Sequence, residues 1–195
     1  LLDFVDDSVK ASYASSFGVL EIPENYRKRY SERLSEFSFL STREDAGRKL
    51  IDVLAGLDAK VVVDPVLLHD KKFWYSKALP QHVNNSDFDL FYVNNSRFLS
   101  IEMIYKSESP RVHFVSIGSF RIRDVLDRKF MIRNGADPMG FLWFIKTART
   151  VFTSSYHAVL FCLIFQKPFF AFMSGNEGRD GRLRHVLKIY ELESR

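Results

Sequence analysis

Residues 150–165 read TVFTSSYHAVLFCLIF, and this stretch decides the fold class. The short apolar run at residues 150–153 predicts a strand, and the apolar segment Tyr156–Phe165 predicts a helix directly after a two-residue turn. A strand followed at once by a helix is the building unit of α/β proteins, whose sheets are mainly parallel. We therefore expect an α/β fold that binds its ligands at the carboxyl ends of the strands.

The same alternation extends through the rest of the chain. Further strands are expected over residues 10–17, 37–42, 59–63, 89–93, 112–116 and 169–173. Further helices are expected over residues 23–37, 43–54, 96–106, 139–148 and 180–190, the last with Asp180 as its N-cap. Residues 66–86 lose this rhythm and are interpreted as a linker. The chain is thus expected to form two domains, residues 1–78 and 79–195.

The composition is that of a globular protein, with 46% hydrophobic and 27% charged residues in a chain of 195. The formal net charge of +4 is modest and the basic residues are dispersed, which argues against a nucleic-acid-binding surface. The single cysteine, Cys162, excludes a disulfide framework, and the histidines lack metal-ligand spacing. The longest apolar run, Ala158–Phe165, is too short to span a membrane. We expect a cytoplasmic protein with no metal and no transmembrane segment.

The turn between strand and helix is the best candidate for chemistry. A helix N-terminus offers backbone N–H groups and the positive end of the helix dipole, both of which suit phosphate or carboxylate. Thr153, Ser154 and Ser155 add hydroxyl groups there, and His157 falls in the first helical turn. Imidazole changes its charge near neutral pH, as a general acid or base requires. In the alternative interpretation, one serine only caps the helix and His157 only packs.

Four short elements carry a further signal because of their order along the chain. They are Ser12-Tyr13-Ala14-Ser15-Ser16-Phe17-Gly18, Ser41-Thr42-Arg43-Glu44-Asp45-Ala46-Gly47, Val63-Asp64-Pro65-Val66-Leu67-Leu68, and residues 141–169 with Thr-Ser-Ser-Tyr-His and Lys-Pro-Phe. Together they resemble the polysaccharide pyruvyl transferase family. One departure is Ser155, which stands where many members have arginine. A second is that the family's half-domain before Tyr13 has no counterpart, and the chain begins Leu1-Leu2 without a starting Met. We therefore expect a piece of a longer protein.

The resemblance implies two Rossmann-like parallel-sheet units in a GT-B-like arrangement, the first of them incomplete. It implies transfer of pyruvate from phosphoenolpyruvate, a co-substrate, to a sugar diol that is free or lipid-linked, with no cofactor and a pyruvate ketal as product. The catalytic candidates are His157 and Arg43. The donor-binding candidates are Thr153, Ser154, Ser155 and Arg182, and the acceptor-side candidates are Tyr13, Ser16 and Glu44.

Other interpretations stay open at this point. A guanidinium such as that of Arg43 can grip a carboxylate or phosphate, but it can also form an ion pair with Glu44 or Asp45. The glycine-rich run at 175–182 can wrap an anion or be a surface loop. Asp87-Phe88-Asp89 imitates a metal-binding Asp-X-Asp, although a strand there would point one carboxylate away. The chain could also be a GT-B glycosyltransferase with a nucleotide-sugar donor, or a non-catalytic glycan-binding module.

Overall fold

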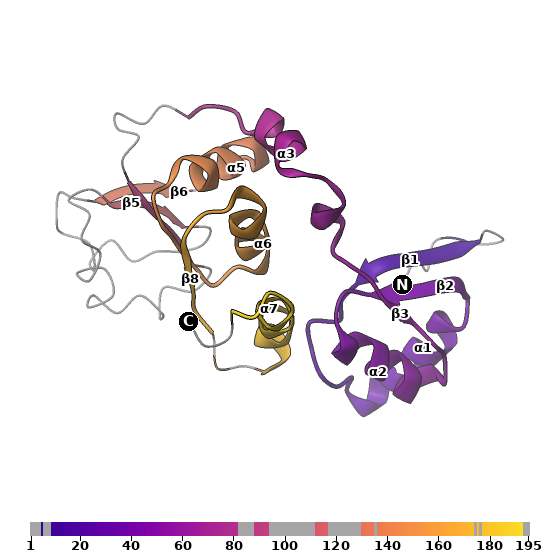
Figure 1. The fold of residues 1–195 in the computed structure, drawn as a ribbon. Helices are drawn as coiled ribbons and strands as arrows, with labels where there is room; N and C mark the ends of the chain where they lie inside the picture. Colours follow the sequence, from indigo (N-terminus) through magenta and orange to yellow (C-terminus); the bar gives the residue numbers. More distant parts are fainter. Residues whose placement is uncertain are drawn as a thin grey trace. The chain divides into compact units, whose positions relative to one another are not determined.

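The computed structural model describes residues 5, 9–81, 88–93, 112–116, 130–134, 136–173, 175 and 177–192. Contacts group the chain into two compact units (Figure 1). Leu1–Leu68 and Gly175–Arg195 make up the first unit, and His69–Ser174 make up the second.

The first unit contains a three-stranded parallel sheet in the order β1-β2-β3. Its elements are β1 (Lys10–Ser15), α1 (Glu24–Leu34), β2 (Phe37–Thr42), α2 (Asp45–Ala55), β3 (Lys60–Val61), the 3-10 helix η1 (Pro65–Leu68) and α7 (Glu177–Ile189). The connections from β1 to β2 and from β2 to β3 contain α1 and α2, which lie on one face of the sheet, as Figure 1 shows. Leu34, Leu40, Ile51 and Ala59 form the buried core between them. Gly56 ends α2 in a left-handed conformation with φ of 63°, which glycine adopts without steric cost.

The second unit contains a five-stranded parallel sheet in the order β6-β5-β4-β7-β8. Its elements are α3 (Lys71–Lys77), β4 (Asp89–Tyr92), β5 (Val112–Ser116), β6 (Phe130–Asn134), α5 (Pro138–Thr147), β7 (Val151–Thr153), α6 (Tyr156–Phe165) and β8 (Phe169–Ala171). The chain leaves β4 in one direction, through β5 and β6, and returns to the other side of β4 at β7. This reversal makes the pair β4–β7 a topological switch point, where open α/β sheets form a crevice beyond their carboxyl ends.

Aromatic and aliphatic side chains fill the core of the second unit. Phe88, Phe91, Phe144 and Phe165 are fully buried. Helix α6 is apolar on nearly every side, and its segment Ala158–Cys162 is buried throughout. That pattern fits a helix enclosed between a sheet and neighbouring helices rather than one lying on a surface.

Most of the predicted elements that the structure describes are confirmed to within a few residues, but two predictions are wrong and one strand was missed. Residues 66–86 are not a plain linker, because they contain η1 and α3. Helix α3 begins where the Asp70 carboxylate caps the amide of Phe73, and Trp74 packs its ring 5.1 Å from that of Phe161. Strand β6 was not predicted, and its partner along the sheet is β5. Asp180 is not an N-cap, since α7 begins three residues earlier at Glu177.

The helix expected at residues 96–106 lies outside the described residues. The expected domains, 1–78 and 79–195, differ from the two compact units at two places. Helix α3 groups with the second unit, where it packs against α5, and the segment from Gly175, which contains α7, groups with the first. As a division into domains, the predicted boundary stays a prediction. In the part of the chain that the structure describes, no helix is long and apolar enough to cross a bilayer.

Candidate functional site

The turn after β7 lies at the switch point of the second unit. The Thr153 hydroxyl donates a hydrogen bond to the Tyr92 carbonyl at 2.6 Å, which ties the end of β7 to the end of β4. The same oxygen accepts from the Ser155 amide at 3.0 Å. Thr153 is fully buried. Its hydroxyl therefore holds the turn in place. Thr153 can affect a ligand only indirectly, by positioning Ser154 and Ser155.

Ser155 is the N-cap of α6. Its backbone is extended, with φ of −93° and ψ of 125°, and its Oγ accepts from the Ala158 amide at 3.4 Å. The alternative in which a serine caps the helix is therefore present in the structure. Capping uses a lone pair of the oxygen, so the hydroxyl hydrogen keeps the chemical capacity to donate to an anion. The neighbouring Ser154 amide donates to the Tyr92 carbonyl at 3.4 Å, which adds a second tie between the strands.

His157 is the second residue of α6 and is exposed. Its ring lies 5.3 Å from the ring of Tyr156, nearly perpendicular to it at 77°. The imidazole thus stands in the first turn of a helix, where the dipole favours negative charge on a ligand. The switch point therefore combines a helix N-terminus, hydroxyl groups and an accessible proton-transfer group within five consecutive residues, Thr153–His157.

At the amino end of β4, away from the switch point, Arg149 donates two parallel hydrogen bonds to Asp89. Arg149 Nε lies 3.1 Å from Asp89 Oδ1, and Nη2 lies 2.9 Å from Oδ2. Both oxygens of this buried carboxylate are therefore engaged by a guanidinium. Asp87, the other carboxylate of the apparent metal motif, lies outside the described residues. Among the residues that the structure does describe, no group of His, Cys, Asp and Glu is arranged to hold a metal ion.

In the first unit, a bulge in β1 shapes the carboxyl edge of the sheet. Ala14 has φ of 52°, a left-handed conformation that is unfavourable for a residue with a Cβ. The Ser41 hydroxyl bridges the bulge: it accepts from the Ala14 amide at 3.0 Å and donates to the Ser12 carbonyl at 2.9 Å. The bulge shifts the register of β1 against β2 between Ser12 and Ser15. Bulges of this kind re-aim the residues that follow, here Ser16.

Arg43 follows β2 and reaches across the sheet edge toward β3. Its Nη1 donates to Asp64 Oδ2 at 2.7 Å, and its Nε lies 3.8 Å from Glu44 Oε2. The predicted ion-pair alternative is thus present, with Asp64 and Glu44 as the acids. Asp45 contacts Arg48 and Lys49 instead, and hydrogen bonds from these two, first Lys49, lower the pKa of Asp45.

Glu44 connects Arg43 to Ser16. The Ser16 hydroxyl donates to Glu44 Oε1 at 2.5 Å, a length typical of a hydroxyl bonded to a carboxylate. Glu44 is only 6% exposed, and its Oε2 has no hydrogen-bond partner among the described residues. Four residues that are distant in the sequence, Ser16, Arg43, Glu44 and Asp64, therefore form one contact cluster, called here the β1–β3 edge cluster.

The remaining candidates have different surroundings. Tyr13 lies in β1 immediately before the bulge and is 46% exposed. Arg182 is not in a loop, because it lies in the second turn of α7. The loop before α7 is short, and the Gly175 amide donates to Asp180 Oδ2 at 2.8 Å.

The structure thus groups the predicted residues into two sets. Thr153, Ser154, Ser155 and His157 come together in the second unit. Ser16, Arg43 and Glu44 come together in the first. Asp64 was not predicted as a site residue, although its place in an Asp-Pro pair after a buried strand is a signal that could have identified it. Tyr92 contributes its backbone carbonyl, which accepts from the Thr153 hydroxyl and the Ser154 amide. Every residue has such a carbonyl, so the identity of the side chain could not have indicated this role.

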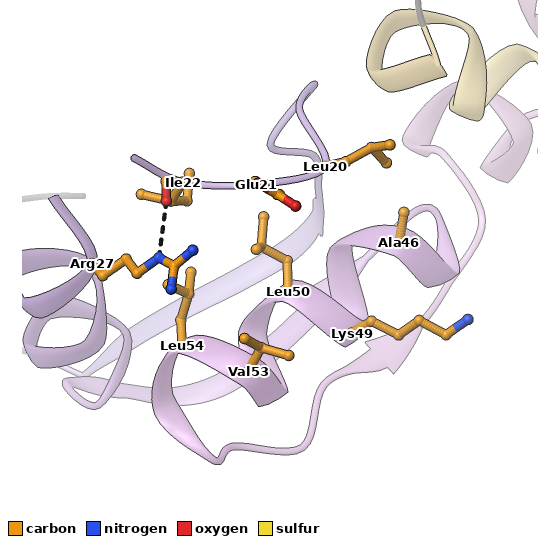
Figure 2. Close-up of a pocket in the computed structure, with 9 residues that line it drawn as sticks. All are labelled: Leu20, Glu21, Ile22, Arg27, Ala46, Lys49, Leu50, Val53 and Leu54. Carbon is orange, nitrogen blue, oxygen red and sulfur yellow. Dashed lines mark hydrogen bonds between the residues drawn. The ribbon is translucent and has the colours of Figure 1, made fainter. Parts of the chain in front are cut away.

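A pocket of about 450 Å³ in the first unit has a different character (Figure 2). It lies between the segment Leu20–Ile22 and α2, and Figure 2 shows Leu50, Val53 and Leu54 pointing toward it. Arg27 Nε donates to the Ile22 carbonyl at 3.1 Å, which holds this segment over the helix. None of the predicted site residues lines the pocket. It is an apolar hollow beside the core and is separate from the β1–β3 edge cluster.

Two parallel-sheet α/β units, with a polar turn at the switch point of the second, define an α/β protein of the GT-B-like class. One solved structure supports this class by its fold. The UDP-GlcNAc 2-epimerase of Methanocaldococcus jannaschii, in complex with UDP-GlcNAc and UDP, is 13% identical with a TM-score of 0.53, over 83% of this chain and 56% of that chain. The predicted fold class is thereby confirmed.

The chain belongs to the polysaccharide pyruvyl transferase family, whose model matches residues 1–176. The family is one of transferases. No curated protein matches the chain significantly. Two further structures are a second one of the M. jannaschii epimerase (15% identity, TM-score 0.47, 77% and 50% of the two chains) and a putative UDP-N-acetylglucosamine 2-epimerase from Listeria monocytogenes (10%, 0.44, 81% and 52%). The chain spans about half the length of the solved structures that it matches.

Proposed function

We propose that this chain contributes to an enzyme that transfers pyruvate from phosphoenolpyruvate to two hydroxyl groups of a saccharide. Family membership supports a pyruvyl transferase, and one observation carries the donor assignment: the turn Thr153–His157 lies at the switch point between β4 and β7. The positive end of the α6 dipole and the Ser155 hydroxyl suit the phosphate or carboxylate of the donor. His157 is exposed beside them.

The chemistry requires few groups. A proton is added to the methylene carbon of phosphoenolpyruvate, and positive charge develops on C2. One sugar hydroxyl then forms a bond to C2 and loses its proton. The C2–O bond to phosphate breaks and inorganic phosphate leaves. The second hydroxyl then bonds to C2 and loses its proton to close the ketal. Of the two protons that the hydroxyls release, one replaces the proton given to the methylene carbon and the other protonates the phosphate. In this scheme His157, as imidazolium, donates the first proton or binds the departing phosphate, and Ser154 and Ser155 assist.

The remaining assignments follow the family resemblance. Arg43 is the second catalytic candidate, Arg182 a further anion ligand, and Tyr13, Ser16 and Glu44 belong to the acceptor side. The acceptor is a free or lipid-linked saccharide used in polysaccharide biosynthesis. We place the reaction in the cytoplasm because that is where phosphoenolpyruvate is produced.

The proposal is tested with His157→Ala in the whole protein, assayed for release of inorganic phosphate from phosphoenolpyruvate that depends on added saccharide. Loss of a general acid or base lowers turnover by about 10²–10⁴-fold. The matched control is His185→Ala, a partly exposed histidine in α7 that has no part in the proposed site. Turnover of the His157 variant equal to that of the His185 variant would show that the assignment is wrong.

A nucleotide-sugar donor is the second candidate, because the M. jannaschii epimerase of similar fold was solved with UDP-GlcNAc and UDP. Calorimetric titration with phosphoenolpyruvate and with UDP, each against wild type and His157→Ala, separates the two donors. Binding of UDP without binding of phosphoenolpyruvate would favour a glycosyltransferase. Binding of saccharide alone, without turnover of either donor, would favour a glycan-binding module.

A further inference from the structure

We propose that Lys71, Lys146 and Lys167 of the second unit together bind a phosphate group, carried either by a free metabolite or by a lipid headgroup. The three residues, called here the lysine cluster, come from the start of α3, from the last turn of α5 and from the position after the C-cap of α6. The proposed pyruvate transfer uses none of them, so the inference goes beyond the proposed function and does not depend on it.

The lysine cluster lies at the amino edge of the sheet, away from the turn Thr153–His157. Helix α5 leads into the start of β7, and α6 runs from the end of β7 back to the start of β8, so both helices end at that edge. The 10 residues of α6 span about 15 Å, which separates the two places. A ligand at the lysine cluster therefore leaves the switch point open.

The ring of Tyr75 brings two of the lysines together. Lys71 Nζ lies 5.2 Å from the centre of this ring, and Lys146 Nζ lies 4.6 Å from it. The ring itself packs against the buried ring of Phe165, with their centres 4.8 Å apart. Attraction of ammonium groups to an aromatic ring thus holds two positive charges at one place before any ligand binds.

Lys167 adds a third positive charge beside Lys71. Lys71 Nζ donates to Oε1 of Gln166 at 3.2 Å, and the next residue, Lys167, donates from its Nζ to the Ala148 carbonyl at 2.9 Å. Burial lowers the pKa of Lys167, and the charge of Lys71 lowers it further. A neighbouring positive charge disfavours the protonated form, so the two ammonium groups repel each other. An anion between them would offset that repulsion.

Among the described residues, no carboxylate pairs with the lysine cluster. The described part of the second unit contains three carboxylates, and each has another partner. Asp70 and Asp137 accept from backbone amides at the N-termini of α3 and α5. Asp89 accepts two hydrogen bonds from Arg149. The lysines contact only uncharged oxygens and the aromatic ring, so their charge is available to a ligand.

Neutralisation of helix C-termini is the alternative role for these lysines. The C-termini of α5 and α6 each carry about half a negative charge, so together they offset about one of the three positive charges. The pair Arg149–Asp89 at the same edge has no formal net charge. About two positive charges therefore remain. A phosphate monoester carries about 1.5–2 negative charges at neutral pH, so this surplus favours a phosphate group over a single carboxylate.

The test measures the affinity of the whole protein for inorganic phosphate, from the rise in melting temperature with phosphate concentration against chloride at equal ionic strength. Tryptophan fluorescence is the readout because both tryptophans, Trp74 and Trp143, belong to the second unit. Every variant also carries His157→Ala, which removes the histidine of the proposed donor site. Lys71→Gln and Lys146→Gln should each raise the Kd for phosphate about tenfold, as expected for the loss of one hydrogen bond between charged groups.

The matched control is Lys72→Gln, which replaces an exposed lysine in the same helix and should change the Kd by less than about twofold. Lys146→Arg keeps the charge and should bind phosphate as the parent protein does, which separates loss of charge from loss of folding. Phosphate affinities of Lys71→Gln and Lys146→Gln that equal the affinity of the control would count against the lysine cluster.

Lipid vesicles distinguish the two sources of the phosphate group. The protein is sedimented with phosphatidylcholine vesicles that contain or lack phosphatidic acid. Retention on phosphatidic acid that is lost in Lys146→Gln and kept in Lys72→Gln assigns the phosphate to a lipid headgroup, and binding of free phosphate alone assigns it to a metabolite. The inference is wrong if neither probe binds, or if the cluster variants bind both probes as the control does. None of these measurements requires turnover, so the outcome is independent of the proposed function.

Discussion

Replacing Ser41 by alanine should destabilise the first unit, because one hydroxyl holds the bulge that shapes the β1–β3 edge cluster. Ser41 is fully buried, and its Oγ both accepts from the Ala14 amide and donates to the Ser12 carbonyl. Alanine makes neither bond. The strand would then contain a buried amide without a partner at a residue whose left-handed backbone is already unfavourable.

The expected magnitude follows from these two contacts. A buried donor left without a hydrogen bond costs about 1–3 kcal/mol, and a carbonyl that can gain water costs less. The Ala14 amide is buried, whereas the Ser12 carbonyl is in a partly buried bond. We therefore expect Ser41→Ala to lower the free energy of unfolding of the first unit by about 2 kcal/mol. The left-handed conformation of Ala14, which costs about 1–2 kcal/mol, makes the bulge the first place to open.

Native-state hydrogen exchange followed by mass spectrometry measures this effect in the correct unit. Both tryptophans, Trp74 and Trp143, belong to the second unit, so their fluorescence reports on that unit. Peptides that cover β1 should exchange about 30-fold faster in Ser41→Ala, the factor that corresponds to about 2 kcal/mol. Ser38→Ala, at an exposed position of β2, is the control and should change exchange by less than about threefold.

The reasoning would be refuted if the two variants exchanged alike over β1. It would also be refuted if Ser41→Ala accelerated exchange equally in β7 and α6, since that result would indicate global unfolding rather than release of the bulge. A tryptophan-detected urea midpoint that is the same as that of the wild type is therefore part of the expected result.

Two further predictions concern the second unit. Gln166 ends α6 in a left-handed conformation with φ of 56°, which glycine adopts without steric cost. Gln166→Gly should therefore raise the free energy of unfolding of the second unit by about 0.5–1 kcal/mol, seen as a higher melting temperature by tryptophan fluorescence. A lower melting temperature would contradict this. Burial raises the pKa of the Cys162 thiol from 9.0 to about 12, so the folded state retains a proton that the unfolded state loses. Stability should therefore fall between pH 9 and 12 by about 1.4 kcal/mol per pH unit more in wild type than in Cys162→Ala, and equal slopes in urea titrations would show the thiol to be unimportant.

Local features of the fold could be predicted because they depend on neighbouring residues. The strand β2 and the helix α6 have the bounds that their apolar patterns indicate, and Ser155 caps the helix that follows it. Helix α3 could not be predicted in the same way. Its aromatic residues show no amphipathic period over seven residues, and their partners are distant in the sequence: Phe161, which contacts Trp74, lies 87 residues further along the chain.

In the candidate site, too, features set by neighbouring residues could be predicted, whereas contacts between distant residues could not. The sequence by itself determined the family motifs, the polar turn before α6 and the residue types available for catalysis, since these are matters of identity and short spacing. Only the tertiary structure decided that β7 lies beside β4, which makes that turn a switch point, and that Arg43 contacts Asp64, 21 residues away. The physical reason is that strand order and ion pairs depend on contacts between distant segments, for which local periodicity contains no information.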